Sequence, residues 1–282
     1  MTVGTVGAVG SRTAVLLAEL APRRSAAATV LVRPGVVKTG SVLLFLAVWE
    51  LLGRHVDPIL LSYPTAILRA FPVLIASGEL TRHAGSSLLS FLGGFGLAVA
   101  VGIPVGLLMG RYRLAEYALD WHVHALYATP RVATIPLLVL WLGLGTAVKI
   151  AIVFLTAVFP IVLATYRGAR SVGPHFTETA LAYGAGPLQV FVKVFLPATF
   201  PYVVAGVRLG IGRGIIGITL AELFTAVSGL GYLLVAYANS FATDRLFVPV
   251  VVLAGFGVAL TEGLGWLQRR LAPWKETERI LE

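Results

Sequence analysis

The chain lacks cysteine entirely and contains few charged residues. The absence of cysteine excludes disulfide bonds, thiolate metal ligands and cysteine nucleophiles. Asp, Glu, Lys and Arg make up 12% of the 282 residues, whereas soluble globular domains carry about 25%. Residues 86–110, 132–148, 150–166 and 246–261 hold no charge at all. With 57% hydrophobic residues, the chain has more apolar surface than one core of this size can bury, so lipid must solvate part of it.

The long uncharged segments predict membrane-spanning helices. A helix needs about 20 residues to cross the hydrocarbon layer, and backbone groups in lipid must be paired inside helices or a closed barrel. Runs such as 135–141 do not alternate between apolar and polar residues, which favours helices over a barrel. We therefore predict an all-α polytopic membrane fold with about six spans. The predicted spans are residues 39–53, 86–109, 132–144 (with a possible backward extension over 114–128), 149–165, 201–224 and 247–267.

The distribution of basic residues predicts the orientation of these spans. With the N-terminus in the cytoplasm, seventeen Lys and Arg residues fall on the inner side, counting two in the inner half of the fifth span. Only Arg54, Arg69, Arg82, Lys149 and Arg245 fall outside. Both termini are then cytoplasmic. Residues 1–38 are expected to form a basic, mobile arm, and residues 276–282 a C-terminal tail. The net charge of +9 thus reflects contact with anionic headgroups, not with nucleic acid.

An amphipathic helix is expected on the outer side, between the first two spans. Apolar residues recur there at spacings of three and four, at Ile67, Leu68, Phe71, Leu74 and Ile75. Such a helix can lie on the membrane surface.

The polar stretch between the fourth and fifth spans, residues 166–200, cannot enter the membrane. Thr177 can cap a helix that begins with Glu178. Residues 184–187 (Gly-Ala-Gly-Pro) predict a break, and a second short helix is expected from Pro187 until Leu196-Pro197 ends it. The product is a compact helix-turn-helix that could fit a groove on a partner protein, or could be an ordinary helical loop.

The spacing in this loop resembles that of the permeases of binding-protein-dependent ABC importers. Their pattern is Glu-Ala-Ala, three residues, Gly, nine residues, Ile, one residue, Leu-Pro. The chain departs from this pattern at Thr179 and, mildly, at Val194. The residues that would contact the ATPase are Glu178, Thr179, Ala180, Gly184, Leu196 and Pro197.

The resemblance has implications for fold, partners and location. It implies a type I importer core with the MetI-like fold, in a bacterial cytoplasmic membrane. The chain would be a transport subunit and not an enzyme, since ATP and Mg²⁺ are bound by a partner ATPase. The expected assembly contains two ATPases, an extracytoplasmic binding protein and a second permease copy in a homodimer, with a heterodimer as the alternative.

Further stretches resemble the nitrate, sulfonate and taurine branch of these permeases. They include His83, residues 86–88, 93–95, 136–145 and 193–202, Ala221-Glu222 and residues 229–231. The resemblance covers about residues 40–275 and implies a small oxyanion as substrate. A pyrimidine-type vitamin precursor or an aromatic acid is the alternative, and a secondary transporter is a further one.

The fifth span carries three charged residues, Arg208, Arg213 and Glu222, that could line a pathway or gate. Alternatively, Arg208 reaches for headgroups, and Arg213 could do either. Glu222 could pair with Lys149 or Arg245 at an outer gate. Stripes of small residues in two spans predict close helix packing, within the subunit or across a two-fold interface. The stripes contain Gly102 and Gly106 in the second span and Gly206, Gly210 and Gly214 in the fifth.

Three other patterns predict no site. Residues 212–217 read G-x-G-x-x-G but follow no strand, so dinucleotide binding is not expected. No Gly-Lys-Ser/Thr sequence is present to cradle phosphates. His122 and His124 point to different helix faces with no thiol or acidic cluster nearby, so no metal site is expected.

Overall fold

The computed structural model describes residues 34–225 and 227–271, and all regular secondary structure within these ranges is helical. The all-α expectation is therefore confirmed. Most of the expected N-terminal arm and all of the expected C-terminal tail lie outside the described residues. The chain divides into two compact units, one ending at Val56 and one beginning at Asp57.

The first unit contributes a single helix, α3 (Pro34–His55). It is long and apolar enough to cross a membrane, and it includes the expected first span. Glu50 and Arg54 form an ion pair near its end, with 2.7 Å between Oε1 and Nε. A lone helix has no core of its own, so apolar side chains such as Leu43 and Phe45 need lipid or protein around them.

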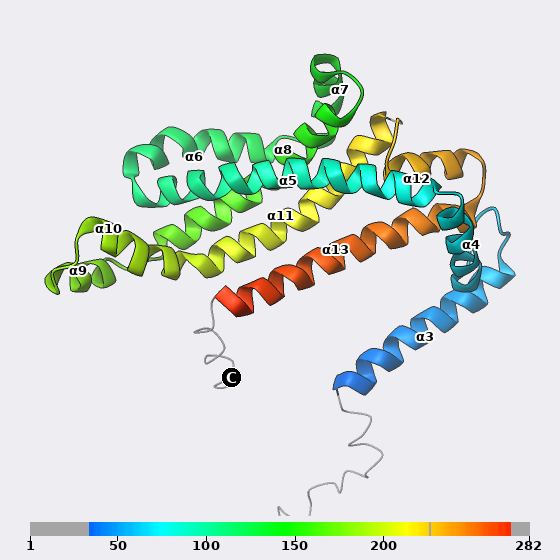
Figure 1. Cartoon of the computed structure of the whole chain (residues 1–282), viewed down its shortest axis with the longest axis horizontal. Helices are drawn as coiled ribbons and strands as arrows, with labels where there is room; N and C mark the ends of the chain where they lie inside the picture. The colour runs from blue at the N-terminus through cyan, green and yellow to red at the C-terminus, as the bar shows by residue number, and fades with distance from the viewer. Residues whose placement is uncertain (1–33, 226, 272–282) are drawn as a thin grey trace, which may run out of the picture. The chain divides into compact units, whose positions relative to one another are not determined.

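The second unit is built on three long helices. They are α5 (Glu79–Arg111), α8 (Thr146–Arg170) and α11 (Leu196–Thr225). α8 packs along both α5 and α11, as Figure 1 shows. Its central residues Val153, Ala157 and Ile161 are fully buried. Because α8 is covered on both sides, it forms the core against which the other two helices are held.

Glycine lets these three helices approach closely. A β-carbon at Gly106 of α5 would lie 2.7 Å from Thr165 Cβ, and one at Gly206 of α11 would lie 2.8 Å from Ala164 Cβ. Contacts this short leave no room for any side chain. The other stripe glycines, Gly102, Gly210 and Gly214, face Ile161 and Phe91 in the same way. Both stripes therefore pack inside the subunit, the first of the two arrangements expected from the sequence.

Two further helices, α6 (Arg113–Ala128) and α7 (Arg131–Leu142), are bent by 97° at the break between them. Pro130 occupies the position before α7, where its ring disfavours continuing the preceding helix. α7 has only 12 residues, about 18 Å, which is too short to cross the hydrocarbon layer. Within the described ranges, five helices are long and apolar enough to span a membrane, or six if the bent pair counts as one.

The remaining helices are α4 (Pro64–Ala76), α12 (Leu230–Asn239) and α13 (Thr243–Leu271). α4 is the expected amphipathic helix, and it buries Ile67, Ala70 and Leu74 where it packs on α13 and α5. Leu68 and Ile75 are exposed instead. The helix thus has a protein-facing side and a second apolar side, and its position on the outer membrane surface stays a prediction.

Candidate functional site

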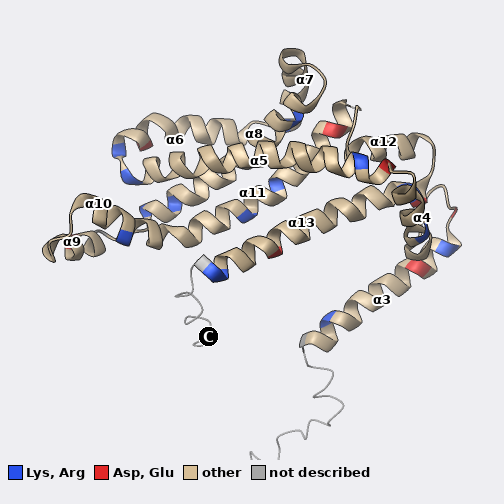
Figure 2. Ribbon diagram, in the orientation of Figure 1, with Lys and Arg blue, Asp and Glu red and all other residues tan. Residues whose placement is uncertain are grey.

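The polar stretch after α8 folds into two short helices. They are α9 (Pro174–Ala182) and α10 (Pro187–Val190), and α10 continues into the π-helical segment η1 (Phe191–Phe195). Together, α9, α10 and η1 are called the loop knuckle below. In Figure 2, basic residues concentrate near it and at the neighbouring ends of α5 and α8, which otherwise carry little charge along their lengths.

Gly184 makes the turn between α9 and α10 possible. Its φ of +79° is a left-handed conformation that residues with a β-carbon rarely adopt. The Gly184 N–H donates to the Leu181 carbonyl at 2.9 Å, and the Ala185 N–H donates to the Ala180 carbonyl at 3.0 Å. This is the Schellman pattern that closes a helix C-terminus. On the other side of the turn, the Gly186 N–H donates to Gln189 Oε1 at 3.1 Å.

Apart from Gly184, the residues predicted to contact the ATPase lie in two groups. Glu178 and Thr179 are exposed on α9, and Ala180 is half-buried beside them. Leu196 and Pro197 are half-buried at the start of α11, the long helix that follows η1. The first group is therefore available to a partner, whereas the second lies where the loop knuckle joins the membrane helix.

Large apolar side chains also lie exposed on the loop knuckle, although no sequence pattern pointed to them. Tyr183 is 89% exposed and Leu188 is 73% exposed, with Phe176 and Leu181 beside them in α9. Exposed aromatic and aliphatic residues on a polar segment outside the membrane favour a contact with another protein. Their sequence signal was weak, because apolar residues occur throughout this chain.

Two local expectations for this stretch are wrong. The first helix begins at Pro174 with Gly173 at the N-cap, one turn before the expected cap at Thr177. Proline is favoured in a first turn because its fixed φ suits a helix and the N–H it lacks would be unpaired there. The second helix does not end at Leu196-Pro197, since α10, η1 and α11 run on without a break. Pro197 follows directly after η1, where the Leu196 N–H bonds the Phe191 carbonyl and the regular i→i−4 pattern is already interrupted.

The charged residues of α11 fall into two separate places. Arg208 and Arg213 are exposed, while Glu222 is completely buried. Glu222 lies nine residues beyond Arg213, which is about 14 Å along the helix axis. The arginines and the carboxylate therefore do not form one site. Arg208 Nη2 lies 3.8 Å from the position of a β-carbon at Gly265 in α13.

Glu222 lies at the centre of a buried polar cluster with Ser87, Lys149 and Ser228, called the Glu222 cluster below. Ser87 Oγ of α5 lies 2.8 Å from both carboxylate oxygens, to which it donates. Lys149 Nζ of α8 lies 3.5 Å from Glu222 Oε1 and is 1% exposed. Arg245, the alternative partner, instead lines a shallow pocket with Arg69 and Asp244.

The cluster also fixes the turn between α11 and α12. Lys149 Nζ donates to the Ser228 carbonyl and hydroxyl, the latter at 2.9 Å. The Gly231 N–H donates to Glu222 Oε2 at 2.9 Å, and the Leu230 N–H donates to Ser87 Oγ at 2.8 Å. Every charged atom of the cluster therefore has partners, as burial requires. Three long helices and one turn are joined through a single carboxylate and a single ammonium.

Glycine is required where the turn passes the carboxylate. Gly229 has a φ of +106°, and a β-carbon there would collide with the carboxylate of Glu222. A β-carbon at Gly231 would lie 2.7 Å from Glu222 Cβ. In the sequence these positions belong only to stretches that resemble the permease branch, and no role could be assigned to them: His83, Ser87, Gly229 and Gly231. A signal was present, because a glycine-rich turn closely follows the one acidic residue of the fifth span.

No group of three or more His, Asp or Glu side chains that could hold a metal ion occurs among the residues the structure describes. His122 and His124 each bond a carbonyl oxygen of their own helix, at 3.0 Å.

Comparisons with known proteins identify the family. The chain matches the family described as "Binding-protein-dependent transport system inner membrane component" over residues 102–276. It is 34% identical over 228 residues to a "Probable ABC transporter permease protein" of Brucella abortus (strain 2308), covering 81% of this chain and 91% of that protein. It is 31% identical over 242 residues to the taurine transport system permease protein TauC of Escherichia coli (strain K12), covering 83% and 88%.

A solved structure shows the same fold. It is the inward-facing MetNI methionine ABC transporter, matched with a TM-score of 0.54 and 18% identity over 70% of this chain and 96% of that one. The type I importer fold expected from the sequence is confirmed. In these systems a separate ATPase subunit binds the nucleotide, and an extracytoplasmic protein binds the solute. The chain therefore belongs to the binding-protein-dependent transport system inner membrane components, the multi-pass permease subunits of ABC importers.

Proposed function

We propose that this permease forms the pathway for a small oxyanion of the alkylsulfonate, taurine or nitrate type. The support is the similarity to TauC over most of the chain and the branch-specific motifs at Glu222 and residues 229–231. Selectivity in such systems rests largely with the binding protein. The test is a thermal-shift screen of the binding protein encoded beside this permease. Stabilisation by taurine, an alkylsulfonate or nitrate is expected, whereas a response to an uncharged pyrimidine alone would overturn the assignment.

The loop knuckle is the contact with the ATPase in this proposal. The observation that carries it is an exposed Glu178 on a short helix whose end is fixed at Gly184, beside exposed Tyr183 and Leu188. A rigid polar helix flanked by apolar side chains suits a groove on a soluble partner. The residues assigned to coupling are Glu178, Thr179, Ala180, Gly184, Leu196 and Pro197.

Reversal of charge at Glu178 tests this contact. Glu178→Arg should leave the fold intact, since the side chain is exposed, but should reduce recovery of the ATPase with the affinity-tagged permease. Asp120→Arg, on α6, is the matched control, because Asp120 makes only an exposed contact with His124. Equal ATPase recovery and uptake in the Glu178 variant and the control would exclude the proposed contact.

The orientation follows from the same assignment: the loop knuckle and both termini are cytoplasmic. The basic residues Arg167, Arg170 and Lys193 near the loop support this orientation. Because the chain has no cysteine, single cysteines can be introduced without background labelling. A cysteine at Gln189 should react with a membrane-impermeant maleimide only in inverted vesicles, and one at Ile59 only in intact spheroplasts. The opposite pattern would reject the orientation.

A homodimer with two ATPases completes the proposed assembly, because one chain supplies one loop knuckle and each ATPase needs one. Exposed apolar residues such as Leu140 and Trp141 of α7 provide surface for a second copy or for lipid. Intact-mass spectrometry of the subunits in the purified complex would distinguish a homodimer from a heterodimer, because a sister permease would have a mass different from that of this chain.

The Glu222 cluster is the proposed outer gate. The support is a buried ion pair that holds the α11–α12 turn against α5 and α8. Charges in membrane segments are costly unless paired, and they commonly mark a transport pathway. Arg208 and Arg213 are exposed on the same helix and are assigned to the pathway or the inner headgroup region.

A further inference from the structure

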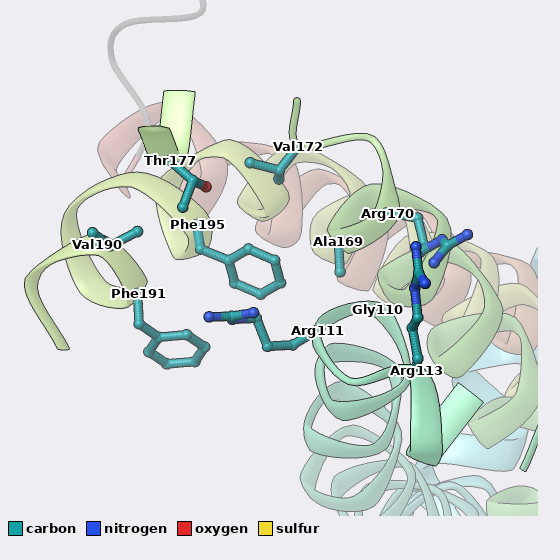
Figure 3. A pocket seen from close by; sticks show the side chains of 10 residues that line it. All are labelled: Gly110, Arg111, Arg113, Ala169, Arg170, Val172, Thr177, Val190, Phe191 and Phe195. Atoms are coloured by element: carbon teal, nitrogen blue, oxygen red, sulfur yellow. The ribbon is translucent and has the colours of Figure 1, made fainter. Parts of the chain in front are cut away.

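A cavity of about 340 Å³ lies where α5 and α8 end against the loop knuckle (Figure 3). One wall carries the side chains of Arg113 and Arg170. Arg111 points toward the phenyl rings of Phe191 and Phe195, which form the opposite wall. The cavity thus combines basic and aromatic walls at the ends of two spanning helices, the depth at which lipid headgroups lie.

The carboxylate of Glu116, which pairs with one of the arginines of this cavity, is already fully engaged. Glu116 Oε2 pairs with Arg170 Nη1 at 2.9 Å, and Glu116 Oε1 accepts the Tyr166 hydroxyl at 2.7 Å. Among the residues that the structure describes, Arg111 and Arg113 have no carboxylate within ion-pair distance. Of the three guanidinium groups that line the cavity, only that of Arg170 is paired with a carboxylate, which leaves a net positive charge suited to a phosphate group.

An apolar groove of about 320 Å³ lies deeper, between α5 and the junction of η1 with α11. Ile103 and Leu107 of α5 line it on one side, and Val192 and Leu196 line it on the other. Residues 103, 107, 110 and 111 follow each other at helical spacings of three and four, so the groove and the cavity share one face of α5. The shared face places an apolar groove one to two turns inward from the arginines, as a lipid's acyl chain requires.

We propose that this face of α5 binds one anionic phospholipid, with its phosphate among Arg111, Arg113 and Arg170 and an acyl chain in the groove. The charge complementarity identifies the headgroup, and the apolar groove distinguishes a lipid from a free anion. A lipid held there touches α5, the end of α8 and η1 together. The site depends neither on the transported solute nor on which side of the membrane the loop occupies.

The test uses the complete permease–ATPase complex in nanodiscs that contain phosphatidylglycerol diluted in phosphatidylcholine, with retained lipid counted by native mass spectrometry. Arg111→Gln/Arg113→Gln should weaken phosphatidylglycerol retention about 30-fold, since each basic side chain near an anionic lipid changes binding about fivefold. Arg111→Lys/Arg113→Lys should keep most of the retention. Leu107→Trp should also reduce it, by filling the groove without removing charge.

Arg167→Gln is the matched control, because Arg167 is exposed at the same end of α8 but does not line the cavity. It should retain lipid as the unmodified complex does. Unchanged retention in the double glutamine variant would overturn the proposal. So would displacement of the lipid by millimolar inorganic phosphate together with normal retention in Leu107→Trp, since the site would then be a free-anion site. If the double glutamine variant lost the ATPase but kept the lipid, the arginines would contact the ATPase and not a lipid, and the proposal would be overturned.

Discussion

Lys149 Nζ of α8 lies 3.5 Å from Glu222 Oε1 of α11, and neither side chain is more than 1% exposed. The two residues are 73 positions apart in the chain. The carboxylate of Glu222 accepts hydrogen bonds from the Ser87 hydroxyl and the Gly231 N–H. The ammonium of Lys149 donates hydrogen bonds to the carbonyl and hydroxyl of Ser228. The surroundings of the two charges are therefore not interchangeable.

Neutralising one member of this pair should be more damaging than neutralising both. Glu222→Gln leaves a buried ammonium without its counter-charge, which costs about 3–5 kcal/mol. Lys149→Met/Glu222→Gln removes both charges and should recover much of the stability. Thermal unfolding of the purified complex measures the difference. A double variant no more stable than Glu222→Gln alone would contradict a direct pairing.

A charge swap, Lys149→Glu/Glu222→Lys, should not restore uptake. The new lysine would face the Gly231 N–H, a donor that cannot turn into an acceptor. Solute uptake in cells, compared with the doubly neutral variant, measures this outcome. Full uptake by the swapped variant would show that the two positions require only opposite charges, whichever residue carries which charge.

Gly229→Ala should destabilise the turn between α11 and α12. The added methyl would collide with the Glu222 carboxylate, and alanine is disfavoured at a φ of +106°. Gly212→Ala is the control, because a β-carbon there meets nothing within 4 Å and alanine favours a helix by about 0.5–1 kcal/mol. Unfolding temperatures of the two variants should move in opposite directions, and equal shifts would count against the close contact.

Gly184→Val should weaken the coupling between solute binding and ATP hydrolysis without affecting the packing of α5, α8 and α11. A branched residue in a left-handed conformation costs at least about 1–2 kcal/mol, so α9 would change its angle to α10. Gly184→Asn should be better tolerated, since asparagine adopts this conformation more readily. Gly186→Ala is a second control, with a φ of −71° and open space around it. Solute-stimulated ATP hydrolysis by the complex is the measurement, and normal stimulation in Gly184→Val would show that the turn geometry is not needed.

Gly210→Leu should disrupt the packing of α11 on α8. A β-carbon at Gly210 would lie 3.0 Å from Ile161 and 3.3 Å from Phe95, so a leucine would push the helices apart. Gly212→Leu, on an open face two residues on, should assemble normally. Size-exclusion chromatography of the complex compares the two, and an intact, transport-active Gly210→Leu complex would contradict the packing.

Composition and periodicity were sufficient to predict the helical membrane fold, because uncharged segments of 16 to 25 residues admit few other structures. The bend between α6 and α7 was not predictable to the same degree. Pro130 marks a break, but the angle of 97° involves the packing of α7 against α8 and α11, which a local sequence pattern does not show. The continuation of the helix through Leu196-Pro197 was missed because a π-helical segment has no distinct sequence pattern.

In the candidate site, too, local features could be predicted from the sequence and long-range contacts could not. Glu178 and Gly184 could be located from spacing, because a helix end and a left-handed turn are local features. The partners of Glu222 depend on long-range contacts, so Lys149 and Arg245 were equal candidates until α8 was placed beside α11. Ser87 and Ser228 could not be assigned, since serine in a membrane helix has many uses.

The unbroken helix from Pro187 to Thr225 has a mechanical consequence. Its first residue lies three positions beyond Gly184, and Glu222 lies 35 residues farther on, about 52 Å along the axis. Bending is easiest near its start, where the π-helical segment η1 is followed by Pro197 and Pro201, because such features interrupt the i→i−4 hydrogen bonds. Beyond Pro201 the helix continues to Glu222 without another proline, so a movement made at that bend would carry the buried ion pair with it.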